Sequence, residues 1–393
     1  MPITILHGDC RDTLKTIAAG TVQCCVTSPP YWGLRSYLRK DHPDKAREIG
    51  QEKTPEAYVE TMVQVFREVR RCLHESGVVF LNVGDSYAGS GRGTPGHNAI
   101  GNQIERQGFN GDDDPHGARK NKTDAPPGHK AKDLCLIPWM LAIALKADGW
   151  YLRSVICWHK KSCMPESVTD RPTNSWEPIF LLAKSQRYFY DSEAVKEPYT
   201  ESVGKDRVGA PWIEDAPEGT RNDGGRMRSD FYKNGGRNQR NVWTLGPEPY
   251  SEAHFATFPT EIPRRAILAG TSAKGRCPKC YAPWERIVEK KNNGFTDRTF
   301  RSPHDVQTEG MTNGTGKTTL AQEIQTTTIG WQPTCKCGVD AVVPCTVLDP
   351  FGGSGTTGSV ATDLGRNAIL CELNDAYLPL IQKRTNVTQG MAL

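Results

Sequence analysis

The residues best suited to chemistry form the run Thr27-Ser28-Pro29-Pro30-Tyr31-Trp32, which follows the apolar segment 22–26. The apolar segment predicts a buried strand. Two consecutive prolines cannot continue that strand, because each lacks an N–H group and has a fixed φ. The strand therefore ends in a rigid corner that presents a hydroxyl, carbonyl groups without strand partners and an aromatic ring. Such a corner can hold a planar group bearing an NH2, although an ordinary proline turn with an aromatic ring packed on it has the same sequence.

A second run, residues 347–358, indicates a strand, a glycine-rich loop and the start of a helix. Gly353 and Gly355 let a ligand approach the backbone and the helix N-terminus closely. Glu372 follows in the next predicted strand, 367–373, about 20 residues later, which is the spacing of a carboxylate that binds a ribose hydroxyl pair. Nicotinamide-dependent oxidoreductases share this glycine pattern, so they remain an alternative.

The run Asp349-Pro350-Phe351 before the glycines, together with the Ser-Pro-Pro-Tyr corner, separates this chain from the nicotinamide-dependent oxidoreductases. The two motifs resemble those of DNA amino-methyltransferases that use S-adenosylmethionine. Their order, with the corner first and the glycine loop near the C-terminus, is similar to the permuted beta group of that family. The resemblance covers most of the chain. It implies an α/β fold with a doubly wound, Rossmann-like methyltransferase sheet and a circularly permuted motif order.

The resemblance also implies roles for single residues. A base flipped out of double-stranded DNA would lie against the corner, which consists of Ser28, Pro29, Pro30 and Tyr31. The methyl donor would be bound by Asp9, Asp349, Phe351, Gly353, Gly355, Thr356, Glu372 and Phe258. Asp9 would face the adenine of the donor, and the same side chain can cap the helix predicted to begin at Arg11.

The predicted chemistry concerns an exocyclic NH2 group, which is a poor nucleophile because its lone pair is delocalised into the ring. The Ser28 hydroxyl and the Pro29 carbonyl can accept its two hydrogens and so localise the lone pair. Tyr31 would stack on the flipped base and offset part of the cost of unstacking. The electrophilic methyl group is held in line, so positioning supplies much of the acceleration. No covalent cysteine intermediate is needed.

In this family Ser-Pro-Pro-Tyr usually accompanies methylation of cytosine N4, and Asp-Pro-Pro-Tyr that of adenine N6. The resemblance therefore implies N4-cytosine methylation, with N6-adenine methylation as the alternative. A nicotinamide-dependent oxidoreductase would leave the corner unexplained. A non-catalytic, zinc-bearing DNA-binding protein would bind DNA without binding the donor.

Four of the 13 cysteines form two close pairs, Cys277-x-x-Cys280 and Cys335-x-Cys337. Two such pairs match a tetrahedral zinc site without an open ligand position, which would hold the shape of a small zinc-ribbon-like insertion. The second pair is one residue shorter than usual, and Cys345 is an alternative ligand. Free thiols without a metal are the alternative to a zinc site. The remaining thiols and the lack of a secretory signal predict a reduced, cytoplasmic protein. The family resemblance implies that it is bacterial or encoded by a phage.

The length of 393 residues predicts one large domain with insertions, or two domains. The net charge of +4 suits a protein that touches a polyanion over part of its surface. No apolar run is long enough to span a bilayer. A homodimer and a cognate restriction endonuclease are the further partners that we consider. Residues 314–318 resemble a phosphate-binding loop, but Met311 replaces the required glycine, so we expect no ATP site.

Composition and motifs predict seven segments. They are a catalytic half of the core (1–84), a flexible insertion loop (85–132), a continuation of the core (133–195), a target-recognition region (196–245), a methionine-side cofactor block (246–271), the zinc-ribbon-like insertion (272–346) and a cofactor-binding half (347–393). The target-recognition region interleaves basic and aromatic residues, a composition that suits contact with phosphates and bases, and a charged surface loop is the alternative. The blocks 158–161 and 174–177 resemble family blocks that shape the base pocket.

Overall fold

The computed structural model describes residues 2–34, 36–89, 125–163, 165–197, 237–246, 248, 258–292 and 324–385. The chain divides into two compact units. Unit 1 comprises 1–195, 240–285 and 333–393, and unit 2 comprises 196–239 and 286–332. Most of the predicted insertion loop and target-recognition region, and all of the run 314–318, lie outside the described residues. The division into seven segments stays a prediction.

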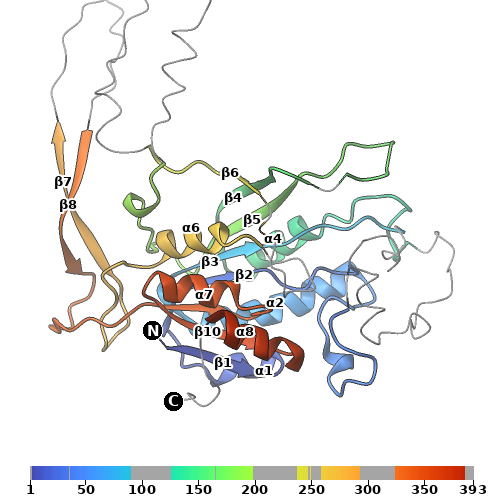
Figure 1. The fold of residues 1–393 in the computed structure, drawn as a ribbon, viewed down its shortest axis with the longest axis horizontal. Coiled ribbons are helices and arrows are strands. Elements are labelled where there is room, and N and C mark those ends of the chain that lie inside the picture. The colour runs from blue at the N-terminus through green and yellow to red at the C-terminus, as the bar shows by residue number, and fades with distance from the viewer. Residues whose placement is uncertain are drawn as a thin grey trace, which may run out of the picture. The chain divides into compact units, whose positions relative to one another are not determined.

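Unit 1 contains an eight-stranded sheet with the order β1-β10-β9-β2-β3-β5-β4-β6 (Figure 1). Its strands are β1 Ile3–His7, β2 Val22–Thr27, β3 Leu73–Asn82, β4 Tyr151–Lys160, β5 Trp176–Ala183, β6 Val242–Leu245, β9 Thr346–Asp349 and β10 Asn367–Glu372. From β1 to β3 all neighbours are parallel. Strand β5 runs antiparallel to β3 and β4, and β6 is parallel to β4.

The sheet order places the end of the chain in the middle of the sheet. Strands β9 and β10 lie between β1 and β2, so the glycine-loop strand β9 pairs directly with the corner strand β2. Parallel neighbours require crossover connections, which helices provide. The predicted doubly wound α/β fold with a permuted motif order is therefore confirmed.

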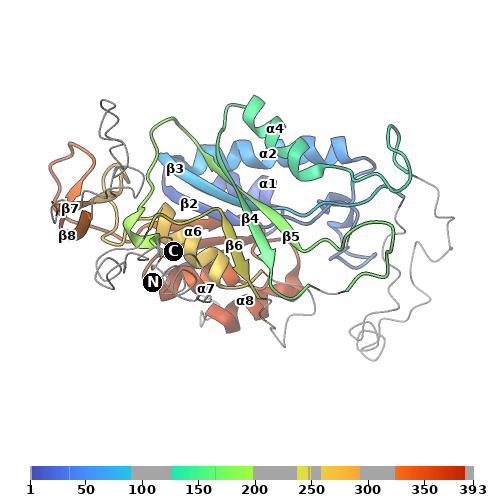
Figure 2. The same cartoon turned by 90° about the horizontal axis from the view of Figure 1, so that it is seen from above.

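Helices cover both faces of the sheet. Figure 2 shows α1, α2 and α4 on one face and α6, α7 and α8 on the other. Their bounds are α1 Cys10–Thr13, α2 Pro55–Cys72, α4 Ile137–Ala147, α6 Glu261–Gly270, α7 Thr356–Asp363 and α8 Leu378–Thr385, with short 3-10 turns η1 Leu14–Thr16, η2 Lys45–Arg47, η4 Glu193–Val195 and η7 Asp375–Tyr377. Each face has its own buried apolar cluster. Among the described residues, no helix is both long and apolar enough to span a membrane.

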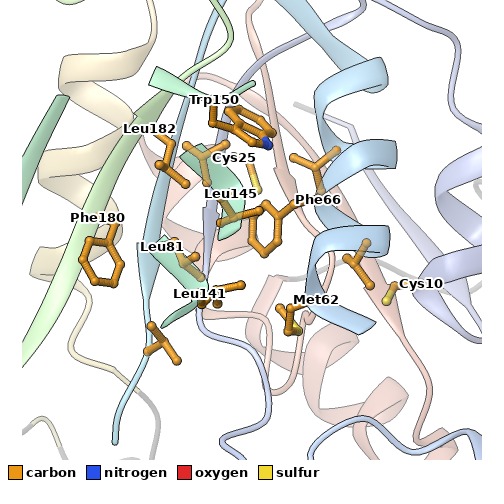
Figure 3. Close-up of a cluster of buried hydrophobic side chains, with 14 of the residues drawn as sticks. Cys10, Cys25, Met62, Phe66, Leu81, Leu141, Leu145, Trp150, Phe180 and Leu182 are labelled. Atoms are coloured by element: carbon orange, nitrogen blue, oxygen red, sulfur yellow. The ribbon is translucent and has the colours of Figure 1, made fainter. Parts of the chain in front are cut away.

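The residues at the beginning of helix α2 favour the start of a helix. The Thr54 hydroxyl accepts a hydrogen bond from the Ala57 N–H at 3.2 Å, and Pro55 occupies the first turn. Apolar residues spaced three and four apart then face the sheet, and Figure 3 shows Met62 and Phe66 among them. Phe66 meets Trp150 edge-on at a centroid distance of 6.4 Å. This helix thus fixes the face of the sheet behind the corner.

Unit 2 is described mainly through its two-stranded sheet of β7 Trp284–Asn292 and β8 Ile324–Pro333, of which β7 begins and β8 ends in unit 1. The Arg286 guanidinium lies over the Trp331 ring at 4.5 Å. A guanidinium over an aromatic face is a favourable pairing. It links the two strands of this small sheet.

On the face of the eight-stranded sheet opposite to α2, helix α6 approaches the strands through Gly270, its last residue. A Cβ atom at Gly270 would lie 2.7 Å from the Cys24 sulfur and 2.8 Å from the Cγ2 atom of Val78. Both contacts are too short for real atoms. The close approach of α6 to β2 and β3 therefore depends on the missing side chain.

We expect Gly270→Ala to lower the free energy of unfolding by about 1–3 kcal/mol, because the added methyl overpacks a fully buried contact. Urea denaturation monitored by circular dichroism measures the loss. Gly246→Ala is the matched control, since a Cβ there meets nothing within 4 Å. Equal stabilities for the two variants would contradict the packing argument.

Candidate functional site

The corner stands at the carboxyl end of β2, as predicted. Its backbone is anchored from behind: the Tyr58 hydroxyl donates to the Pro30 carbonyl at 2.9 Å, and the Trp32 indole N–H donates to the Glu52 carbonyl at 2.9 Å. In the described part of the chain, the Pro29 carbonyl has no hydrogen-bond donor. The corner therefore offers a carbonyl acceptor on a rigid support.

The Tyr31 ring lies against the backbone of Gly84, just after β3. A Cβ at Gly84 would come within 2.5 Å of the Cε2 atom of Tyr31, so only glycine allows this seat. Burial, and then the nearby Glu177 carboxylate, raise the pKa of Tyr31 well above its usual value. The Tyr31 hydroxyl consequently stays protonated and acts as a hydrogen-bond donor.

A polar network surrounds that hydroxyl. Tyr31 donates to the Oε2 atom of Glu177 at 2.7 Å, and the Ser28 hydroxyl donates to the Tyr31 oxygen at 3.3 Å. The Nδ2 atom of Asn82 donates to the same Oε2 atom at 3.2 Å. Lys160 forms an ion pair with the Oε1 atom of Glu177. Strands β2, β3, β4 and β5 thus converge on one carboxylate.

The glycine loop begins at Asp349, the last residue of β9. Its buried carboxyl group accepts hydrogen bonds from the hydroxyls of Thr27 and Thr357, both at 2.7 Å, and from the Phe351 N–H at 3.0 Å. Burial raises the pKa of Asp349 to about 7, and these donors counteract part of that rise. Through Thr27, this group ties the loop to the strand that carries the corner.

Glu372 ends β10 beside the glycine loop. Its two oxygens accept the Gly353 N–H at 2.7 Å and the Asn374 N–H at 2.8 Å. Burial raises the pKa of Glu372 to about 7, and the backbone donors lower it. The carboxyl group therefore lies next to the glycines, as the spacing predicted. Gly355 adopts the left-handed conformation (φ 81°) as the N-cap of α7.

Asp9 is the N-cap of α1, which confirms one of its two predicted roles. Its carboxylate accepts the Arg11 N–H at 2.8 Å and forms ion pairs with the guanidinium groups of Arg11 at 2.5 Å and Arg47 at 3.0 Å. Arg47 comes from the loop after the corner, so this cluster fastens that loop to the start of α1.

These groups surround one pocket of about 400 Å³. The volume is of the order found for small-molecule sites, about 300–1,000 Å³. All residues predicted to contact the base or the donor line this pocket, except Gly355. Gly355 lies behind it, where a Cβ would come within 3.2 Å of Ile381. The pocket lies at the carboxyl edge of parallel strands, where ligands bind in open α/β sheets.

Sequence reasoning missed Asn82 and the role of Thr27 in holding Asp349. Asn82 could have been noticed as the polar residue that directly follows the run Val78-Val79-Phe80-Leu81. The blocks containing Lys160 and Glu177 were expected to shape the base pocket, and both residues line it. Their mutual contact was not predicted, since it joins two strands through side chains.

The four predicted cysteines come together in unit 1. The sulfur atoms of Cys277, Cys280, Cys335 and Cys337 all lie within 4.8 Å of one another. Cys345 is not part of this cluster, and its thiol donates to the Ser272 carbonyl at 3.7 Å. A turn in which the Tyr281 N–H donates to the Cys277 carbonyl at 3.0 Å closes the first pair. The unusual spacing of the second pair therefore still brings its sulfurs to the first.

The chain is similar in sequence to one family of DNA methylases and to type II methyltransferases. A sequence model of the N6/N4 DNA methylase family matches residues 22–276 and 345–383. The chain is 38% identical over 383 residues to the type II methyltransferase M.XycI of Xanthomonas campestris pv. cyanopsidis, covering 97% of this chain and 87% of that protein. It is 32% identical over 382 residues to the type II methyltransferase M.SmaI of Serratia marcescens, covering 97% and 89%.

Among solved structures, the chain is similar to the PvuII DNA methyltransferase (cytosine-N4-specific), with a TM-score of 0.49 and 14% identity over 97% of this chain and 85% of that one. The matched sequence family includes both motifs that line the pocket, the corner and the glycine loop. The family resemblance inferred from these motifs is thereby confirmed: the chain belongs to the N6/N4 DNA methylase family and is an S-adenosylmethionine-dependent DNA methyltransferase.

Proposed function

We propose that this protein methylates the exocyclic N4 atom of cytosine in double-stranded DNA. The observation that carries the proposal is the shared pocket, which Ser28 and Pro29 of the corner line together with residues of the glycine loop. Serine at the first position of the corner favours cytosine over adenine. N6-adenine methylation, with the same fold and mechanism, is the second candidate.

The Ser28 hydroxyl and the Pro29 carbonyl would accept hydrogen bonds from the two N–H groups of the flipped base and hold its lone pair toward the donor. Tyr31 would support the base inside the pocket in place of its stacked neighbours. S-adenosylmethionine supplies an electrophilic methyl group on a sulfonium. The remaining contribution of the chain is to exclude water and to hold the two reactants in line.

The donor would lie along the loop formed by β9, the glycines and the end of β10. Glu372 would accept the ribose hydroxyls, and Asp9 would face the adenine with the Arg11 and Arg47 ion pairs holding its carboxylate in place. Phe351 and Phe258 supply apolar walls of the pocket. Gly353 keeps the loop free of side-chain bulk at this wall.

We further propose that Cys277, Cys280, Cys335 and Cys337 bind one structural Zn²⁺. Zinc bonded to four thiolates at about 2.3 Å brings the sulfurs to roughly 3.8 Å from one another, and the observed cluster lies within 4.8 Å. Four sulfur ligands leave no open coordination position, so the ion would stabilise the fold and take no part in methyl transfer.

We also propose a cognate restriction endonuclease as a functional partner, because the two relatives described above are named as type II enzymes. Such a pairing requires that both proteins recognise the same DNA sequence. A homodimer stays a prediction.

The first experiment identifies the product. Incubation with S-adenosylmethionine and unmethylated DNA, followed by digestion to nucleosides and mass spectrometry, should yield N4-methylcytosine. Ser28→Ala and Tyr31→Ala should each lower the rate by about 100-fold, because each removes a group that holds the base. Ser185→Ala is the control, as its hydroxyl bonds to the carbonyls of Glu75 and Arg187. N6-methyladenine would establish the second candidate instead.

Donor binding should depend on pH through Glu372. The folded pKa of about 7 lies above the ordinary value of 4.5, so this group stabilises the donor-free fold below about pH 4.5 and that contribution is lost as pH rises toward 7. Ribose hydroxyls donate to the ionised carboxylate, so affinity should rise over the same range. We expect S-adenosylhomocysteine to bind about ten-fold more tightly at pH 8 than at pH 6 by calorimetry. Glu372→Gln should remove most of this difference, because Asp349, the other group assigned to the donor that titrates in this range, already has its carboxyl bonded to Thr27 and Thr357. An unchanged pH dependence in that variant would exclude the assignment.

Elemental analysis should find one zinc per chain. Cys280→Ser should lose the metal and lower the melting temperature, because the cluster then lacks one of its four thiolates. Cys163→Ser is the control, since Cys163 is exposed and outside the cluster. A metal-free parent protein with the same melting temperature as the zinc-loaded form would contradict the proposal.

A further inference from the structure

We propose that Glu177 is the final acceptor of the proton that the target amino group loses, and that this proton travels through the hydroxyls of Ser28 and Tyr31. The inference rests on the proposed function, because it requires Ser28 beside the reacting nitrogen. Glu177 acts through Tyr31, which makes it a positioning residue of the reaction.

Methyl transfer to an amino group leaves one proton too many. The nitrogen lone pair forms the new N–C bond, the S–C bond of the donor breaks, and its electron pair stays on sulfur. The nitrogen then carries a positive charge until one proton departs. A serine hydroxyl cannot retain that proton, because a protonated alcohol is a very strong acid. A neutral product therefore needs an acceptor beyond Ser28.

The hydrogen bonds around the corner point toward such an acceptor. The Ser28 hydroxyl donates to the Tyr31 oxygen at 3.3 Å, and the Tyr31 hydroxyl donates to the Oε2 atom of Glu177 at 2.7 Å. The hydroxyl protons of Ser28 and Tyr31 thus both point toward the Glu177 carboxylate. The lone pairs of the Ser28 oxygen remain available to the amino group of the base. The first bond is long, as catalytic hydrogen bonds often are before substrate tightens the site.

The transfer balances in three moves. One proton passes from the nitrogen to the Oγ atom of Ser28, the Ser28 proton passes to the oxygen of Tyr31, and the Tyr31 proton passes to the Oε2 atom of Glu177. Both hydroxyls end neutral. The positive charge of the sulfonium and the negative charge of the carboxylate have both disappeared, so no further reactant is required.

The Oδ1 atom of Asn82 is the other acceptor within reach of these hydroxyls, but it cannot keep the proton. The Oδ1 atom of Asn82 also lies 3.1 Å from the Tyr31 oxygen and 3.5 Å from that of Ser28. A neutral amide is too weak a base to keep the proton. Asn82 instead donates from Nδ2 to Glu177 and to the Pro178 carbonyl, both at 3.2 Å, which fixes its orientation.

Among the described residues, the charged and titratable groups that face the Glu177 carboxylate are Tyr31 from the corner and Lys160 from β4. Lys160 binds Oε1 and leaves Oε2 to Tyr31. The raised pKa of Tyr31 means that its hydroxyl passes a proton on without keeping the negative charge itself. The side chains of Glu177 and Lys160 are 14% and 31% exposed, so the proton can leave to solvent after each turnover.

The test measures single-turnover methyl transfer by rapid quench, with full-length protein, saturating S-adenosylmethionine and a DNA that the parent protein methylates. The variants are Glu177→Gln, Tyr31→Phe and the double variant. Glu75→Gln is the matched control, since its carboxylate pairs with Lys184 at 3.7 Å and neither residue lines the pocket. Affinities for DNA and S-adenosylhomocysteine are measured alongside.

We expect each single variant to be about 100-fold slower with unchanged affinities, and the double variant to be no slower than either, because one broken link interrupts the relay. Glu177→Gln should regain rate as pH rises from 7 to 9, where hydroxide takes the proton directly. A fully active Glu177→Gln, additive losses, or a loss confined to DNA affinity would each overturn the relay alone. An inert parent protein would overturn the proposed function and the relay with it.

Discussion

The structure depends on one buried carboxyl group, that of Asp349. It accepts hydrogen bonds from the hydroxyls of Thr27 and Thr357, and it lies on a strand that pairs directly with the strand of the corner. An isolated carboxyl group would be costly to bury, and three hydrogen-bond donors offset that cost. Thr27 is 322 residues away from Asp349 in sequence, so this contact unites the two ends of the chain.

Joining those strands determines where chemistry can occur. Parallel strands present their carboxyl ends on one edge, so the corner after β2 and the glycine loop after β9 open into the same pocket. Two rigid segments on adjacent strands can hold two reactants in line with little further loss of freedom, which is the main contribution available to a methyl-transfer site. The permuted order of motifs does not disturb this geometry, because the sheet places the end of the chain beside its beginning.

Sequence reasoning succeeded where the signal is local. The corner, the glycine loop and the paired cysteines all follow from short-range patterns, and the structure brings the first two to one pocket and the cysteines to one cluster. Contacts between distant segments had no such signal. The seat of Tyr31 on Gly84 and the bond from Tyr31 to Glu177 join residues that are 53 and 146 positions apart, and no periodicity predicts them.

The strands that carry the site are also fixed at their other end. Gln23 near the start of β2 donates to the Tyr281 carbonyl at 3.0 Å and accepts the Thr346 N–H, the first of β9, at 2.8 Å. Tyr281 belongs to the turn after Cys280, so the four-cysteine cluster bears directly on the register between β2 and β9. The zinc site proposed for these cysteines would suit this task, because a bound metal restrains a turn without needing a hydrophobic core. Gln23 thus holds this pair of strands at one end and Asp349 holds it at the other, where the corner that carries Ser28 and Tyr31 begins.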